Sequence, residues 1–416
     1  MKVFLYATVV AVAIFHAPLI AGDVLDLDEA ERLAIERDPG LEQGRAMAEA
    51  ERESAVAAGA LPDPELSLGV QNVPVDSFDP ADDRMSMVMI GARQRFPGGQ
   101  SRALTRERGE LTGRVWDAQV QARERELRRQ VRRAWVRWAF ADRKLTLAKE
   151  EAAGFQELVE LTENRYRIGV GSQRDLFRSR LELTAVQERI LSLEETHESA
   201  RAELARWTGR IASGTRPGQG ELPSLADQAL LKERLHEHPL LLAEAHRLAA
   251  AEKSVDIAQQ SYRPDWMVEA SYGHRAARDM EGERISDMAS VMVGMSLPLF
   301  TRNRQDREVA AARAQARAEH HRRMDLLHDL QGQLETELAR YQRRQDLVAL
   351  YEDRILDEAR QRVELEFSAY GADRGDFRDL IRARVDELDY RLRLLRVQQQ
   401  LAESLIEVDY LAGEEQ

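Results

Sequence analysis

Residues 166–175 read YRIGVGSQRD, and residues 367–376 read FSAYGADRGD. The two segments lie at an offset of 201 residues, and each leads through small residues to a final aspartate. Three more pairs of similar segments occur in the same order, at offsets of 200, 200 and 203: ERDP at 36–39 with HEHP at 236–239, Pro64 with Pro264, and VMIG at 88–91 with VMVG at 291–294. Four matched pairs in one order predict a tandem repeat of a single structural unit.

The repeat divides the chain into four parts. Residues 23–212 form the first repeat and residues 224–416 the second, and the Gly- and Pro-rich segment at 213–223 predicts a linker between them. Residues 1–22 contain a lysine, an apolar run and then small residues. This order predicts a secretory signal peptide, with an uncleaved membrane anchor as the alternative.

Proline placement indicates where long helices can form, because proline breaks helix interiors. None occurs between Gly98 and Arg216 or after Pro298, and each of these stretches is interrupted once, by glycines. For the first half we expect a helix at about 26–60, strands at about 64–73 and 85–96, and helices at about 99–165 and 174–212. The second half should repeat this order. The longest helix would span roughly 100 Å, which suits a tube of helices better than a globular core.

Apolar residues recur every seven positions along this longest helix. One series is Val131, Trp138, Leu145, Ala152, Val159 and Tyr166, and the other is Ala134, Ala141, Ala148, Phe155 and Thr162. The spacing is typical of the a and d positions of a coiled coil. Further large residues lie outside both series, at Trp135, Leu147 and Leu158. They predict contact on a second face, as expected for a helix in a multi-helix wall.

Apolar and polar residues alternate in the predicted strands. Leu66, Leu68 and Val70 alternate with smaller or polar residues, and Trp266, Val268, Ala270 and Tyr272 do the same in the second half. This pattern is typical of membrane β-barrels, although an antiparallel sheet in a soluble protein would also show it. Lipid tolerates no open sheet edge, so four strands in a membrane need further copies of the chain. Two copies give eight strands, with an interior filled by side chains, whereas three give twelve and leave a lumen.

Composition excludes several classes of function. The net charge is −13, which argues against general nucleic-acid binding. There is no cysteine, which excludes a thiol nucleophile, a disulfide framework and a lipidated N-terminal cysteine. No nucleophile elbow, P-loop, HExxH motif or complete dinucleotide fingerprint occurs in the sequence. We therefore predict a protein that is not an enzyme and has no cofactor, catalytic site or structural metal site.

The chain resembles the TolC-like outer-membrane factors of tripartite efflux systems. The resemblance covers essentially the whole mature chain and rests on the tandem repeat, on LPDPELSL at 61–68, on SLPLFTRNR at 296–304 and on the two glycine-containing turns. It implies a mainly α fold with a small β part: a homotrimer with an α-helical barrel and a twelve-stranded transmembrane β-barrel. It also implies location in the outer membrane with extension into the periplasm. The implied partners are outer-membrane lipid, a periplasmic membrane-fusion adaptor and an inner-membrane pump of the RND type.

Two acids follow the second turn and are the candidate gate. Asp376 and Asp379 are three residues apart and so share one face of a helix. In a trimer they would form two rings of carboxylates, which favour cations at a constriction, and the resemblance implies an acidic gate here. Helix capping is the alternative, with Asp373 as N-cap and Asp376 at the third position, as Ser172 and Asp175 would be in the first turn.

The turns themselves are the candidate adaptor contacts, by resemblance. Their small residues would admit the backbone of another protein, or would simply end a helix. The candidate contacts are Gly169, Gly171, Ser172, Gly371, Ala372 and Asp373.

The strand region from 61 to 102 is similar to that of family members paired with heavy-metal exporters, so we predict a passive exit duct for heavy-metal cations. Organic toxicants, drugs or proteins of type I secretion are alternative cargoes, and a soluble periplasmic coiled-coil adaptor is the alternative of another class. Met85, Met87 and Met89 should lie opposite the Val88 face of their strand, with Met267 and Met292 on the same side. These thioethers either fill space or offer soft ligands to a metal.

Overall fold

A computed structural model describes residues 24–412 apart from 210, 212, 213, 223, 224, 226 and 280. The predicted signal peptide at 1–22 therefore lies outside the described residues. The chain forms two compact units, and each unit contains segments of both halves of the sequence. Among the described residues, unit 1 comprises those within 24–41, 122–238 and 329–412, and unit 2 comprises those within 42–121 and 239–328.

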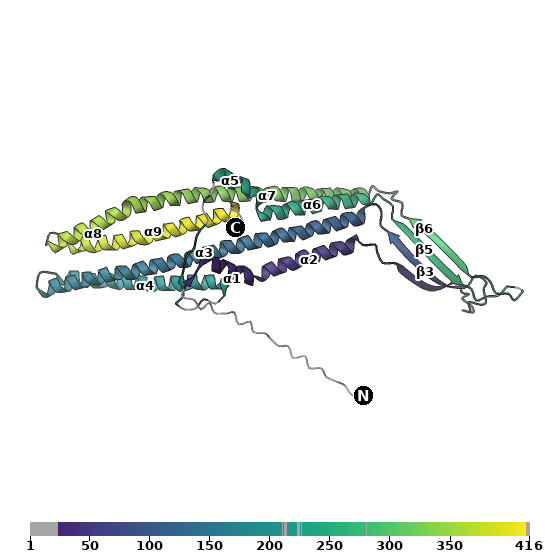
Figure 1. The fold of residues 1–416 in the computed structure, drawn as a ribbon, viewed down its shortest axis with the longest axis horizontal. Coiled ribbons are helices and arrows are strands. Elements are labelled where there is room, and N and C mark those ends of the chain that lie inside the picture. Colours follow the sequence, from purple (N-terminus) through teal and green to yellow (C-terminus); the bar gives the residue numbers. More distant parts are fainter. Residues whose placement is uncertain are drawn as a thin grey trace, which may run out of the picture. The chain divides into compact units, whose positions relative to one another are not determined.

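Helices dominate the described residues, as the sequence predicts (Figure 1). The helices are α1 (Leu27–Arg37), α2 (Pro39–Gly59), α3 (Ser101–Arg167), α4 (Gln173–Thr208), α5 (Gln228–Arg234), the 3₁₀ turn η1 (Leu235–Glu237), α6 (Pro239–Gln260), α7 (Gln305–Leu350), the π-helical turn η2 (Tyr351–Ile355), α8 (Leu356–Gly371) and α9 (Phe377–Ala412). The strands are β1 (Val24–Leu25), β2 (Glu65–Gln71), β3 (Met87–Phe96), β4 (Arg216–Pro217), β5 (Trp266–His274) and β6 (Met288–Met295).

Unit 2 holds a four-stranded sheet at one end of its helices (Figure 1). The strand order is β2-β3-β5-β6, and every neighbouring pair is antiparallel. The two halves of the chain thus meet at the central pair, where Phe96 lies opposite Trp266 and Val88 opposite His274. The outer strands β2 and β6 each leave one edge without a partner in this sheet.

Small residues let the helices of unit 2 approach closely. A Cβ atom added at Gly109 would lie 2.6 Å from Cβ of Ala55, and one added at Gly44 would lie 2.6 Å from a methyl group of Val120. Glycine at these positions therefore allows α2 to pack tightly along the first part of α3. The buried core of unit 2 includes Val115.

Unit 1 consists mainly of two helical hairpins, α3 with α4 and α8 with α9 (Figure 1). One core surrounds Trp138, which is fully buried, as are Leu204 and Val131. A second core lies toward the turns and joins both hairpins, because Phe155 and Leu158 of the first pack with Phe377 and other residues of the second. The two hairpins therefore share one hydrophobic core near their turns.

The predicted heptad seam of α3 is confirmed over most of its length. The series that starts at Ala134 is buried throughout, from Ala134 through Phe155 to Thr162, which is 1% exposed. Trp135 and Leu158, outside both series, are buried too, so α3 does make contact on a second face. The seam ends before Tyr166, which is 46% exposed.

The prediction of one helix at about 26–60 is wrong. The helix breaks at Asp38, whose backbone is extended, and α2 starts at Pro39. Proline disfavours helical geometry in the residue before it and lacks the N–H that a continuous helix would need. The Asp38 side chain accepts the backbone N–H of Leu41 at 3.0 Å and pairs with Arg123 at 2.6 Å. The hydrogen bond from Arg123 lowers the pKa of Asp38.

The described part of the predicted linker pairs with strand β1 at Val24–Leu25. Strand β4 lies parallel to β1, and the N–H of Gly218 donates to the carbonyl of Leu25 at 2.9 Å. The Asp26 side chain accepts the N–H of Gln219 at 2.7 Å. Among the residues described here, no helix is both long and apolar enough to cross a membrane.

Candidate functional site

One face of the four-stranded sheet is apolar and exposed. The register aligns its residues across all four strands: Leu66, Leu68 and Val70 of β2, Val88, Ile90, Ala92 and Phe96 of β3, Trp266, Val268, Ala270 and Tyr272 of β5, and Val291, Val293 and Met295 of β6. Leu68 is 78% exposed and Val291 is 76% exposed. An apolar face of this size is unusual for a surface in contact with water and indicates a lipid or protein partner.

Aromatic residues lie at both ends of this apolar face. Phe96 and Trp266 form a cross-strand pair at the end where the chain joins the helices, and Tyr272 lies near the opposite end. The hydroxyl group of Tyr272 donates to Asp287 at 2.5 Å. Aromatic side chains in two bands are typical of transmembrane strands at the two membrane–water interfaces.

The opposite face of the sheet is polar and is crossed by ion pairs. Arg93 lies opposite both Glu65 and Glu269 in the register and pairs with Glu269 at 2.8 Å and with Glu65 at 3.6 Å. The charged groups thus bind one another on one face, while the other face is mostly apolar, with Gln94 and His274 as its polar residues.

The predicted placement of the methionines is confirmed for the strand residues. Met87 and Met89 lie on the polar face, since Met89 pairs with Gly69 and Gly273 while Val88 and Ile90 belong to the apolar face. Their predicted companions are on that polar face too, because Met267 lies opposite Gly294 and Met292 opposite Glu269. Met85 is different: it precedes β3 in a turn and is 52% exposed. Histidine and acidic residues form no group of three suited to a metal ion within the described part of the chain.

The first turn, between α3 and α4, is built on two glycines. Gly169 has φ of +79°, which favours glycine. A Cβ atom at Gly171 would lie 2.9 Å from Cβ of Arg165 and 3.0 Å from the backbone nitrogen of Tyr166. The hydroxyl group of Ser172 then accepts the N–H of Asp175 at 3.1 Å and caps α4. This confirms the predicted cap of the first turn.

The second turn, between α8 and α9, repeats most backbone hydrogen bonds of the first at an offset of 204. The N–H of Gly169 donates to the carbonyl of Tyr166, and that of Asp373 donates to Tyr370. Gly375 takes the role of Gly171, because its added Cβ atom would lie 2.9 Å from the backbone nitrogen of Tyr370. The offset of 201 predicted from sequence is therefore wrong at the turns by three residues.

This correction changes the capping of the second turn. Asp373 is not the N-cap of α9; it takes the place of Gly169, with φ of +57°. Asp376 corresponds to Ser172, directly precedes α9 and accepts the N–H of Arg378 at 2.9 Å. Asp379 then corresponds to Asp175. The capping prediction for the second turn failed because the offset of 201 aligned GAD at 371–373 with VGS at 170–172, whereas the backbone hydrogen bonds align Asp376 with Ser172.

The two candidate gate residues are both exposed in the single chain. Asp376 caps α9 and pairs with Arg378 at 3.2 Å. Asp379 lies in the first turn of α9, where its negative charge interacts favourably with the helix dipole. Both therefore support the helix start and still present carboxylates at the surface.

The candidate adaptor contacts gather at the two turns as predicted from their sequence positions. Gly169, Ser172, Gly371, Ala372 and Asp373 are exposed, and Gly171 is half-buried. Large apolar side chains that the sequence analysis did not single out lie beside the first turn, and they are strongly exposed: Ile168 at 72%, Val170 at 55%, Phe177 at 58% and Leu181 at 68%. Their exposure could not be inferred from sequence, because helical spacing alone would assign Phe177 and Leu181 to a core.

A contact between the two hairpins lies beside the turns. Arg165 of α3 donates to Asp373, and its guanidinium lies 4.7 Å from the ring centroid of Tyr370. Tyr370 is 5% exposed and packs against Phe377, with ring centroids 5.3 Å apart. Burial raises the pKa of Tyr370. Arg165 was missed from sequence because 208 residues separate it from Asp373.

A family model described as "outer membrane efflux protein" matches residues 31–210 and 230–414. The chain belongs to this family. The two matched segments together cover most of the chain, one in each half. The resemblance to TolC-like efflux factors inferred from sequence is thereby confirmed at the level of the family.

Solved channels share the fold at low sequence identity. The structure is similar to that of CusC, described as forming a transmembrane channel, with a TM-score of 0.78 and 14% identity over 97% of this chain and 96% of that one. It is also similar to the outer membrane protein VceC of Vibrio cholerae, with a TM-score of 0.76 and 16% identity over 93% and 96%. These likenesses confirm the predicted fold of tandem helical hairpins with a small β part.

A curated relative is similar in sequence over part of its length. The fusaric acid resistance protein FusA of Burkholderia cepacia is 25% identical over 228 residues, which cover 51% of this chain. The alignment spans 41% of that protein, or about two fifths of its length.

Proposed function

We propose that the chain is one protomer of a homotrimeric exit duct in the bacterial outer membrane. The amphipathic sheet is the observation that carries this proposal. Its apolar face suits lipid, its polar face suits water, and its two open edges, on β2 and β6, cannot face lipid unpaired. Three copies supply twelve strands, enough to close a barrel around a lumen. Transport through such a duct is passive, and no catalytic step is assigned to this chain.

The sheet can be tested with two matched substitutions on one strand. Leu68→Arg places a charge on the apolar face, and Ser67→Arg places the same charge on the polar face one residue away. A charge facing lipid costs about 2–4 kcal/mol near the bilayer midplane, whereas one facing a lumen costs little. We expect Leu68→Arg to lower the amount of trimer in the outer-membrane fraction several-fold and Ser67→Arg to leave it unchanged. Equal effects, or wild-type protein released by carbonate, would instead favour the soluble adaptor.

The helical turns are the proposed docking site for a periplasmic adaptor, with an inner-membrane pump of the RND type behind it. The apolar residues Ile168, Val170 and Phe177 support this assignment, because they lie beside the turn and are each more than half exposed in a single chain. Replacing Ile168 and Val170 by Ser should reduce adaptor crosslinking at the turn. The exposed Leu347→Ser variant, remote from the turns in sequence, is the control.

Heavy-metal cations are the proposed cargo, and the paired acids Asp376 and Asp379 support this choice. In a trimer they would add six carboxylates at the duct's entrance, which favours cations. The test is accumulation of copper, zinc and cobalt in cells that lack the gene, complemented with wild type or with Asp376→Asn/Asp379→Asn. Asparagine keeps the N-cap and removes the charge. We expect the wild type to restore metal export and the double variant to restore it poorly.

Organic toxicants are the second candidate cargo. The observation that favours them is the similarity to a fusaric acid resistance protein, although it covers about half of this chain. Retention of fusaric acid or organic dyes in the deletion strain, with metal levels unchanged, would replace the metal assignment and leave the proposed duct in place.

A further inference from the structure

The place where β6 returns to the helices combines exposed apolar and cationic groups. Leu297, Leu299 and Phe300 directly follow the strand and are 62%, 71% and 80% exposed. Five exposed arginines lie in the adjoining sequence, at 263, 302, 304, 307 and 313. None of these five forms an ion pair within the described part of the chain. By contrast, Arg322 on the same helix pairs with Glu244.

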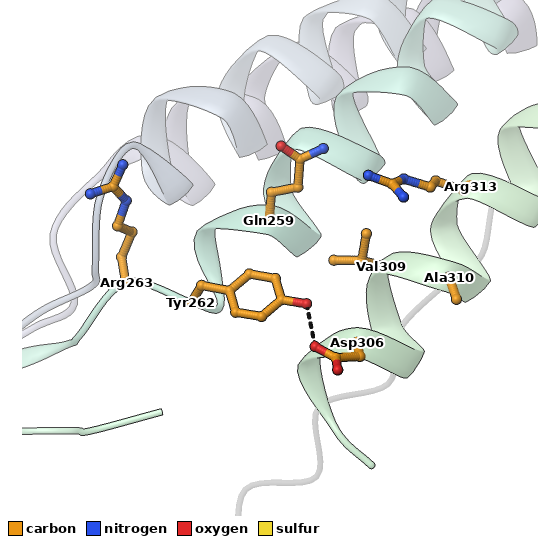
Figure 2. A pocket seen from close by; sticks show the side chains of 7 residues that line it. All are labelled: Gln259, Tyr262, Arg263, Asp306, Val309, Ala310 and Arg313. Carbon is orange, nitrogen blue, oxygen red and sulfur yellow. Dashed lines mark hydrogen bonds between the residues drawn. The ribbon is translucent and has the colours of Figure 1, made fainter. Parts of the chain in front are cut away.

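An open cavity of about 670 Å³ lies among these residues, between the end of α6 and the start of α7 (Figure 2). Its lining is polar and includes Gln259, Tyr262 and two of the arginines. The Tyr262 hydroxyl group donates to Asp306 at 2.7 Å, which fixes the ring across the cavity. Figure 2 shows the Arg313 guanidinium directed toward Gln259, whereas the Arg263 guanidinium lies on the other side of Tyr262 and points away from both. The cavity thus offers the Gln259 amide and the Arg313 guanidinium as donors to an anion, and the one carboxylate in its lining, Asp306, accepts the Tyr262 hydroxyl group.

The cavity lies next to the end of the apolar face that carries Phe96 and Trp266. Trp266 begins β5 and lies opposite Phe96 and Met295. Arg263 is three residues before Trp266, which corresponds to about 10 Å of extended chain. Interfacial tryptophan lies at headgroup level in membrane proteins. Arg263 and the cavity therefore fall where lipid phosphates would be, if the sheet lies in a membrane.

The first repeat lacks this combination. Its corresponding strand exit reads FPGG at 96–99, where the second repeat reads LPLF at 297–300. Gly98 and Gly99 are needed for packing, because a Cβ atom at Gly98 would lie 2.7 Å from the carbonyl oxygen of Pro264. The end of β3 is thus covered by its own chain, whereas in a single chain the residues after β6 are exposed and apolar and lie beside arginines that form no ion pair.

We propose that the cavity binds the phosphate of an anionic glycerophospholipid, with Leu297, Leu299 and Phe300 against its acyl chains. Arg313 holds the phosphate, and Gln259 beside it adds a hydrogen-bond donor. A soluble anion would use the arginines but would have no use for three large exposed apolar side chains beside them. Because the whole chain has a net charge of −13, its overall composition does not account for this local group of arginines. The inference rests on the proposed membrane location of the sheet and adds a defined lipid contact to it.

The test uses the full-length protein purified in detergent and titrated with short-chain phosphatidylglycerol, phosphatidylcholine or inorganic phosphate, followed by native mass spectrometry. We expect saturable binding of phosphatidylglycerol, weaker binding of phosphatidylcholine, and a loss of about fivefold in affinity for Arg313→Gln. Arg174→Gln/Arg360→Gln removes two exposed charges from the helical hairpins and should leave lipid binding unchanged.

A second variant separates lipid from free anion. Leu299→Ser/Phe300→Ser should weaken phosphatidylglycerol binding without changing any interaction with phosphate. Equal binding of inorganic phosphate and lipid, or equal loss in the control pair of arginines, would overturn the proposal. Carbonate extraction of each variant keeps this outcome distinct from failure of the proposed duct: membrane retention with no selective lipid binding rejects only the lipid site.

Discussion

The two turns of this chain share one backbone and differ in what stabilises them. In the first, Tyr166 is 46% exposed and the glycine at 169 supplies the left-handed conformation. In the second, the corresponding Tyr370 is buried against Phe377, and an aspartate occupies the left-handed position. The comparison teaches that a duplicated turn can keep its hydrogen bonds while one copy depends on local geometry and the other on tertiary packing.

Removal of the Phe377 ring should have the largest effect on this difference. Phe377 is 1% exposed in the core shared by both hairpins, so Phe377→Ala should lower the local free energy of opening by about 3 kcal/mol or more. Its counterpart is Gln173, and Gln173→Ala should change the first turn by less than about 0.5 kcal/mol. Hydrogen exchange of the amides around each turn measures both. Similar losses in the two turns would contradict the comparison.

Substitution of the paired glycines tests the offset of 204. Gly171→Ala and Gly375→Ala should each destabilise their turn by about 1–3 kcal/mol, since the new methyl group would meet backbone atoms of the preceding helix end. Gly371→Ala has open space around its Cβ atom and lies at the end of α8, so it should be neutral or stabilising by about 0.5 kcal/mol. Resistance of each turn to proteolysis would rank the three variants. A tolerated Gly375→Ala would disprove the equivalence.

Removal of the caps should affect the two turns equally. Ser172→Ala and Asp376→Ala should each cost about 1 kcal/mol, because each leaves a helix N–H without its acceptor. Asp376→Asn should restore most of the loss in the second turn. Hydrogen exchange at the first turns of α4 and α9 provides the measurement, and an unaffected α9 in Asp376→Ala would show that Asp376 does not act as a cap.

Alkaline pH should lower the stability of the second turn and not of the first, and this is the smallest of the expected effects. Burial raises the pKa of Tyr370, so the folded chain keeps a proton that an unfolded tyrosine loses above pH of about 10. The stability of the second turn is therefore complete below pH 10 and declines as the pH rises through that value. Tyr370→Phe should remove this decline, and exchange rates measured against pH in both turns test it. A decline that persists in Tyr370→Phe would assign it to another group.

Much of the fold follows from local pattern. Heptad spacing identified the buried seam of α3 from Ala134 to Thr162, and two-residue alternation assigned the correct faces of the strands. Both patterns repeat over many residues, so one exception such as Tyr166 does not obscure them. Residue identity also placed the cap at Ser172, because serine before a helix start is a strong local signal.

The remaining features depend on backbone geometry or on contacts between distant segments. The predicted offset at the turns was wrong because the two segments were aligned on their small residues, and the sequence does not show which backbone groups form hydrogen bonds. The increase in offset from 200 to 203 along the chain already pointed toward a larger value. The pairing of Arg165 with Asp373 joins two hairpins and has no local signature. Exposure of Phe177 depends in the same way on which neighbours the tertiary fold supplies.

The π-helical turn η2 gives the second hairpin a different rotational phase. The same number of residues separates Ser101 from Arg167 as Gln305 from Gly371, yet only the second stretch contains a π turn. Such a turn accommodates one extra residue, so side chains beyond Ile355 are rotated by about 100° from their positions in an uninterrupted α-helix. Residues at the same count from Ser101 and from Gln305 therefore face different directions near the turns. Six hairpins in a trimer would alternate between two distinct surfaces, giving threefold and not sixfold symmetry at the entrance.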